Sequence, residues 1–190
     1  MRVFERWFGQ EDPSRDWVAG PAVEFVLDLD ESSLNGARLG DDIERLSALG
    51  PAEDHRAARF GALRYYSKGL SIELQGRQIA SFLLVWQDPL GEGYLPYSGV
   101  CRARGAIVRL APEVTEGELI LALGPAYWRD SDEDELLLFY EHGDVEWQFE
   151  LTADGRLKAL LIVTPPLLAD EEQRRAYGVT GPWPPSGARG

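Results

Sequence analysis

The chain has 190 residues, of which 44% are hydrophobic and 11% aromatic, and it carries a formal net charge of −13. This composition predicts a globular chain with a sizeable core, and the negative charge argues against nucleic acid as a partner, because phosphates would be repelled. The single cysteine, Cys101, excludes an intramolecular disulfide, and no stretch has the apolar length of a membrane span. We therefore expect a cytoplasmic protein that binds neither a membrane nor nucleic acid.

The first 21 residues form a mixed lead. Val3, Phe4, Trp7 and Phe8 have the spacing of one helical face, which predicts a short helix packed on the core. A surface anchor for a membrane or a partner is the alternative, and the shortness of the segment and its acidic residue disfavour it.

Residues 22–87 predict a first unit of one helix and several strands. Residues 22–29 are mostly apolar and rich in β-branched and aromatic residues, which indicates a strand, and a turn is expected at 32–36. Asp41 and Glu44 have the spacing of a capping box, so we expect a helix that ends at Gly50. Alternating residues at 70–75 predict a half-buried strand, flanked by strands at 63–66 and 79–86 in an antiparallel meander.

Residues 88–98 are rich in Pro and Gly and predict a connector to a second unit at 99–166. Thr115 and Glu118 form a second candidate capping box, and strands are expected at 136–141, 145–151 and 157–164. Trp147 lies on the apolar side of the middle strand, so we expect it to be buried. Residues 167–190 predict a short helix at 169–177 and a Pro/Gly tail.

The two units share a four-residue motif. Leu49-Gly50-Pro51-Ala52 returns 74 positions later as Leu123-Gly124-Pro125-Ala126, and residues 41–69 align without a gap with 115–143, with nine identical positions. Ungapped identity with matching hydrophobic positions favours an internal duplication over chance. The predicted fold class is therefore α+β, with two tandem copies of a helix plus antiparallel β-meander unit.

This pattern resembles a known fold. Gly and Pro stand at the end of each predicted helix, and a small antiparallel sheet follows the helix. The residues that carry this pattern are Leu39-Gly40, Leu49-Gly50-Pro51 and their partners in the second copy. Tandem units of this kind resemble the beta-lactamase inhibitory protein-like fold over residues 35–164. The resemblance implies a non-enzymatic scaffold that binds another protein through a concave sheet face.

Charge is distributed unequally between the units. Residues 113–150 contain 12 acidic residues and one base, Arg129, whereas residues 39–73 contain six acids and five bases. The acids concentrate at residues 130–135, whose spacing partly matches a calcium-binding loop. A solvated acidic loop is favoured, because the sixth loop position is Glu135 rather than glycine and a strand follows instead of a helix.

Three aromatic residues are predicted to lie on loops, where large rings often anchor interfaces. Trp128 precedes the acidic stretch, and Tyr94 and Tyr97 lie in the connector. The predicted partner-binding residues are Trp128, Asp130, Asp132, Glu133, Asp134, Tyr94 and Tyr97.

Catalytic signals are weak, because neither His55 nor His142 belongs to a nucleophile motif and one cysteine offers little for a zinc site. We expect no catalytic residue, metal or cofactor. The sequence thus favours a protein-binding module of inhibitor or immunity type with a basic protein partner. The alternative is a small enzyme or ligand-binding protein whose site lies between the two units.

Overall fold

The computed structural model describes residues 11–20, 23–88 and 91–185, so the helix predicted within residues 1–21 falls largely outside the described residues. The strands and helices follow in chain order. They are β1 (Val26–Asp28), β2 (Ser33–Leu34), β3 (Ala37–Arg38), η1 (Ile43–Leu49), α1 (His55–Ala58), β4 (Ala62–Tyr65), η2 (Tyr66–Lys68), β5 (Leu70–Gln75), β6 (Gln78–Val85), β7 (Val100–Ala103), β8 (Ala106–Val108), α2 (Glu116–Leu123), β9 (Trp128–Ser131), β10 (Glu135–His142), β11 (Val145–Thr152), β12 (Leu157–Val163), η3 (Leu167–Ala169) and α3 (Glu171–Ala176).

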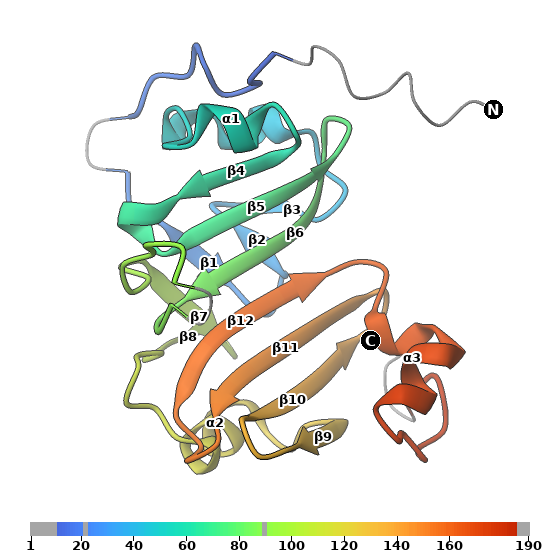
Figure 1. Cartoon of the computed structure of the whole chain (residues 1–190). Coiled ribbons are helices and arrows are strands. Elements are labelled where there is room, and N and C mark those ends of the chain that lie inside the picture. Colours follow the sequence, from blue (N-terminus) through green and yellow to red (C-terminus); the bar gives the residue numbers. More distant parts are fainter. Residues whose placement is uncertain (1–10, 21–22, 89–90, 186–190) are drawn as a thin grey trace, which may run out of the picture.

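The strands form two sheets, and the α+β class is confirmed. A seven-stranded antiparallel sheet has the order β4-β5-β6-β12-β11-β10-β9, and a five-stranded sheet has the order β3-β2-β1-β7-β8. In Figure 1 the larger sheet crosses the view from β4 to β9, and the smaller sheet lies behind it. None of the helices in the described ranges combines the length and apolarity needed to cross a bilayer.

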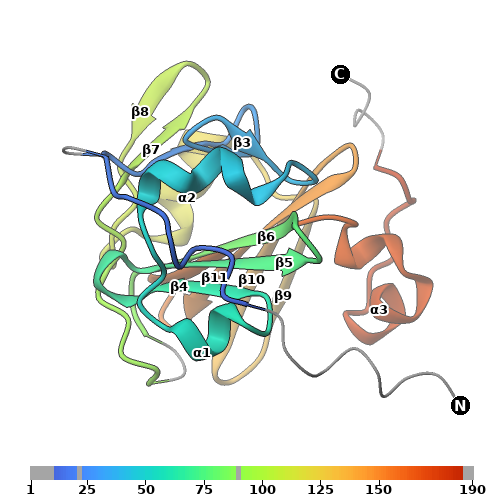
Figure 2. The same ribbon diagram turned by 90° about the horizontal axis from the view of Figure 1, so that it is seen from above.

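The core lies between the two sheets. Leu27 of β1, Leu46 of η1 and Leu119 of α2 pack in one cluster with residues of the larger sheet. The sheet contributes, among others, Leu70, Ile72, Phe82, Leu84, Trp147, Phe149, Leu160 and Ile162. Figure 2 shows the smaller sheet and α2 together on one side of the larger sheet.

The helix starts follow capping chemistry. The second predicted box is confirmed, because Thr115 and Glu118 cap α2 reciprocally. At the first site the cap is Asp42 rather than the expected Asp41, and its Oδ1 accepts a hydrogen bond from the Glu44 backbone N–H at 2.9 Å. Asp41 accepts instead from the backbone N–H of Arg38, so one residue of register separates the prediction from the structure.

A tyrosine forms a hydrogen bond with the glycine at the C-terminal end of η1, and another does so at the end of α2. The hydroxyl of Tyr65 donates to the carbonyl of Gly50, and that of Tyr140 donates to the carbonyl of Gly124, both at 3.0 Å. Both glycines have positive φ, at 81° and 88°, which explains why glycine stands there. Element η1 is a 3-10 helix and α2 is an α-helix, so their hydrogen-bond patterns differ.

The two predicted units, residues 22–87 and 99–166, are called the first and second halves below. They are joined through both sheets rather than arranged as separate domains. Strands β6 and β12 pair antiparallel in the larger sheet, and β1 and β7 pair in parallel in the smaller sheet, with Val26 opposite Val100. Val26 and Val100 are 74 positions apart in the sequence, as are the two copies of the four-residue motif. Superposition of the two halves as copies of one unit stays a prediction.

Several short elements differ from the sequence-based expectation. Residues 32–36, predicted as a turn, include strand β2 and the turn that joins it to β3. Residues 100–108 form the hairpin β7–β8, and residues 55–58 form helix α1. The acidic stretch predicted as a loop begins with strand β9. These elements have two to four residues each, too few for a period to be visible in the sequence.

Candidate functional site

The outer face of the larger sheet, which points away from the smaller sheet, is shared by both halves. Neighbours in a strand point to opposite faces, so residues that alternate with the core side chains lie on it. The strand register places one row across all seven strands, formed by Trp128, Phe139, Gln148, Leu161, Leu83, Ser71 and Arg64. Gln148, Leu161 and Leu83 are half-buried, so the middle of this row is partly open to solvent.

A segment of the chain covers each side of the outer face. On the β4 side, the connector packs Tyr94 against Tyr66, with ring centroids 4.8 Å apart. On the β10 side, residues 165–185, called the C-terminal segment below, pack Tyr177 against Phe139 at 5.1 Å. Trp183 of this segment contacts the ring of Tyr127.

The connector aromatics are not exposed, which corrects the expectation for Tyr94 and Tyr97. Their exposed fractions are 8% and 6%. The hydroxyl of Tyr97 donates to the carbonyl of Phe25, and its ring meets Trp86. Both side chains therefore hold the connector against the sheet, and neither is part of an accessible surface.

The acidic turn between β9 and β10 is open to solvent. Asp132, Glu133 and Asp134 are exposed, and Asp130 is half-buried. Asp132 Oδ1 accepts from the backbone N–H groups of Asp134 at 2.8 Å and Glu135 at 3.0 Å, which lowers the pKa of Asp132. Within the described residues, no group of three or more His, Cys, Asp or Glu side chains is placed to hold a metal ion.

The two basic residues near this turn are engaged with carboxylates. Arg129 Nε donates to Glu116 at 2.7 Å, and Lys158 pairs with Glu150 and with Glu135. The carboxylates of the turn itself therefore have no ion pair among the residues that the structure describes.

Trp128 lies on the outer face at the start of β9. It is half-buried, and its indole Nε1 donates to the carbonyl of Tyr177 at 3.0 Å. This bond ties the strand to the C-terminal segment, so a partner that meets Trp128 would meet that segment as well. Its role as a partner anchor stays a prediction.

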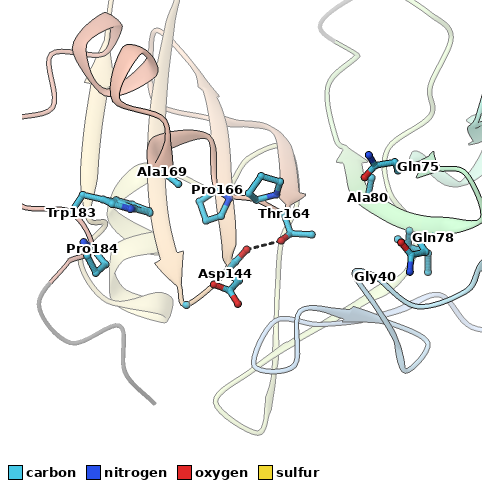
Figure 3. Close-up of a pocket in the computed structure, with 13 residues that line it drawn as sticks. Gly40, Gln75, Gln78, Ala80, Asp144, Thr164, Pro166, Ala169, Trp183 and Pro184 are labelled. Atoms are coloured by element: carbon cyan, nitrogen blue, oxygen red, sulfur yellow. Dashed lines mark hydrogen bonds between the residues drawn. The ribbon is translucent and has the colours of Figure 1, made fainter. Parts of the chain in front are cut away.

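A cleft of about 640 Å³ opens where β6 and β12 separate. Figure 3 shows Trp183, Pro184, Pro166 and Ala169 on one side and residues of the first half on the other. The complete lining is Gly40, Gln75, Gln78, Ile79, Ala80, Gly143, Asp144, Thr164, Pro165, Pro166, Ala169, Trp183 and Pro184. Among these lining residues, only Asp144 has a titratable side chain. The cleft therefore offers aromatic and amide contacts rather than an acid–base pair.

A pair of buried carboxyl groups lies on the outer face near the C-terminal segment. Glu141 of β10 and Glu146 of β11 are directly opposite in the ladder. Glu146 is fully buried and accepts from the backbone N–H of Leu168 at 2.9 Å, whereas both carboxyl oxygens of Glu141 are buried without a hydrogen-bond partner in the described structure. Burial, together with the neighbouring Glu146, raises the pKa of Glu141 to about 9.

This pair was not predicted from the sequence. Glu146 lies between the core positions Val145 and Trp147, and alternation alone places it on a solvated face. Only the return of the C-terminal segment buries it, and no local signal marks that contact.

The remaining candidate residues for catalytic chemistry are Cys101, His55 and His142, and each has different surroundings. Burial raises the pKa of the Cys101 thiol to about 12, which disfavours a reactive thiolate. His55 Nδ1 contacts Asp12 Oδ2 at 2.6 Å, whereas the ring of His142 stacks on Trp147. No hydrogen bond between a histidine and a Ser or Cys side chain is found among the described residues.

Comparisons with known proteins give little further information. No protein-family model matches the chain, and no curated protein matches it. A solved structure of a DUF4309 family protein, YjgB from Bacillus subtilis, is similar at 15% sequence identity and a TM-score of 0.46, over 69% of this chain and 84% of that protein. At this level the similarity assigns neither a fold family nor a function.

Proposed function

We propose that the chain is a non-enzymatic protein-binding module of inhibitor or immunity type, which binds a basic protein through the acidic turn between β9 and β10. The observation that carries this proposal is the exposure of Asp132, Glu133 and Asp134 beside two cations that other carboxylates already occupy. The unbalanced negative potential attracts a cationic surface and accelerates encounter with it. The net charge of −13 supports a protein rather than nucleic acid as partner. A cytoplasmic location is part of the same proposal.

Replacement of Asp132, Glu133 and Asp134 by Asn, Gln and Asn should slow association with the partner and reduce its salt dependence. The reason is that charges outside the packed centre act mainly over long range, and salt screens them over about 8–10 Å. Paired baits, wild type and the triple variant, are used to capture partners from extract, and rates are then measured at two salt concentrations. Equal association rates in low salt would remove the acidic turn from recognition.

Trp128→Ala is the complementary variant. If the exposed part of this ring contacts the partner, its loss should accelerate dissociation and leave the salt dependence of association unchanged. Tyr177→Phe, which retains the backbone carbonyl that Trp128 contacts, controls for changes in the C-terminal segment. A dissociation rate equal to that of wild type would exclude Trp128 from the interface.

The cleft carries a second candidate function, the binding of a small uncharged ligand between the two halves. Both halves contribute to its lining, as the alternative interpretation of the sequence requires. The test is the indole N–H signal of Trp183 in NMR spectra, assigned with Trp183→Ala, during titration with a panel of uncharged small molecules. Signals that stay in place throughout would argue against this function.

A further inference from the structure

Strand β9 is an open edge of the larger sheet. Its strand partner is β10, and no other strand of the described residues pairs with it. The backbone N–H of Asp132 donates to the carbonyl of Glu135, which fixes the alternation of hydrogen-bonded pairs along this ladder. By that alternation, Asp130 bonds toward β10, and the backbone N–H and C=O groups of Arg129 and Ser131 point away from it. Both residues are exposed.

The opposite edge of the sheet is closed. The backbone N–H of Glu53 donates to the carbonyl of Arg64 at 2.8 Å, so the chain that leads into α1 already occupies the outward side of β4. In Figure 1, α1 lies along β4, whereas β9 forms the free lower border of the sheet. An unpaired edge is a template for an additional strand.

The side chains around β9 select the charge of such a strand. On the outer face, Asp130 follows Trp128, and the exposed acids of the turn lie directly beyond Ser131. On the other face, Arg129 is held by Glu116 and by the Ser131 hydroxyl. An added strand therefore meets carboxylates on one of its faces and a neutralised arginine on the other.

We propose that β9 accepts an extended basic segment of the partner as an eighth strand of the sheet, antiparallel to β9. Main-chain hydrogen bonds to Arg129 and Ser131 provide the pairing, and Lys or Arg at every second position of the segment faces Asp130 and the acidic turn. The residues between them are uncharged and face Arg129. This inference rests on the proposed function and specifies how the acidic region binds its partner.

The probe is a fluorescent peptide in which Lys alternates with Val or Thr over eight residues. N-methylation at the Val and Thr positions removes the donors that face β9, whereas N-methylation at the Lys positions removes the donors that face solvent. We expect the first peptide to bind about tenfold or more weakly than the parent and the second to bind within about threefold of it. In the protein, Ser131→Pro should weaken the parent peptide in the same way, because proline removes an outward N–H, with Ser131→Ala as the matched control.

The outcomes separate the mode of binding from the proposed function. Equal binding of both methylated peptides, with loss of binding in the acid-neutralised variant, would overturn strand addition and leave the acidic turn as a binding surface. No binding of the parent peptide at millimolar concentration would also overturn strand addition, while the paired-bait experiment still decides the proposed function. New hydrogen-exchange protection of the Arg129 and Ser131 amides on addition of the parent peptide would support the inference.

Discussion

Replacement of Trp147 by alanine should lower the free energy of unfolding by about 3–5 kcal/mol, as expected for a large aromatic side chain lost from a core. The ring is 5% exposed, which confirms its predicted burial, and it packs in the same cluster as Tyr140 and Phe149. Its Nε1 also donates to the Ser32 hydroxyl at 3.1 Å, so the variant leaves one polar group without its donor. Denaturant unfolding gives the free energy directly.

Trp147→Phe separates the two contributions. It retains most of the buried area and loses the bond to Ser32, and we expect a cost of roughly 1–2 kcal/mol. A second readout is His142, whose ring stacks on Trp147 with centroids 3.7 Å apart and whose pKa burial lowers. In the alanine variant that pKa should rise toward its ordinary value. An unchanged unfolding midpoint would contradict the assignment of Trp147 to the core.

Glu141→Gln should stabilise the protein at neutral and alkaline pH, by about 1–3 kcal/mol, because Glu141 is ionised in the unfolded wild type and must take up a proton on folding. The Gln side chain has a similar shape, needs no proton on folding and supplies an N–H donor for the Glu146 carboxylate. Glu133→Gln, on the exposed turn, is the matched control and should leave stability nearly unchanged. Unfolding measured at several pH values tests the prediction.

The pH dependence has a definite sign. The unfolded chain releases the Glu141 proton near the ordinary value of 4.5, whereas the folded chain retains it until about pH 9. Between these values the folded state binds more protons, so the stability of the wild type falls as pH rises. The advantage of Glu141→Gln should therefore be small below pH 4.5 and grow toward pH 9. An advantage independent of pH would mean that Glu141 is ionised in the folded protein.

The proposals for the β9–β10 region are independent of these stability effects. Glu141 and Trp147 lie on β10 and β11, and their changes report on packing, whereas the variants at Ser131 and in the acidic turn alter groups exposed to solvent. A variant that fails to bind but unfolds like the wild type therefore reports on recognition rather than on folding.

Local patterns in the sequence determined the longest elements. Alternation placed β5 and β11, and Trp147 was correctly assigned to the core face. The Thr115–Glu118 box placed the start of α2, because capping depends on residues three apart. The exposed acids at 132–134 could also be predicted, since charged residues next to a turn stay in water unless they are paired.

Tertiary contacts decided what the candidate site contains. Tyr94 and Tyr97 lie on a loop, but the loop folds back onto the sheet and buries them. Glu146 alternates with core residues, yet the N–H of Leu168, 22 positions away, covers its carboxylate. Strand β9 is too short for its period to be recognised, and its ladder with β10 defines it. Local periodicity describes one strand at a time, whereas burial and edge exposure depend on segments distant in sequence, so only the folded chain reveals them.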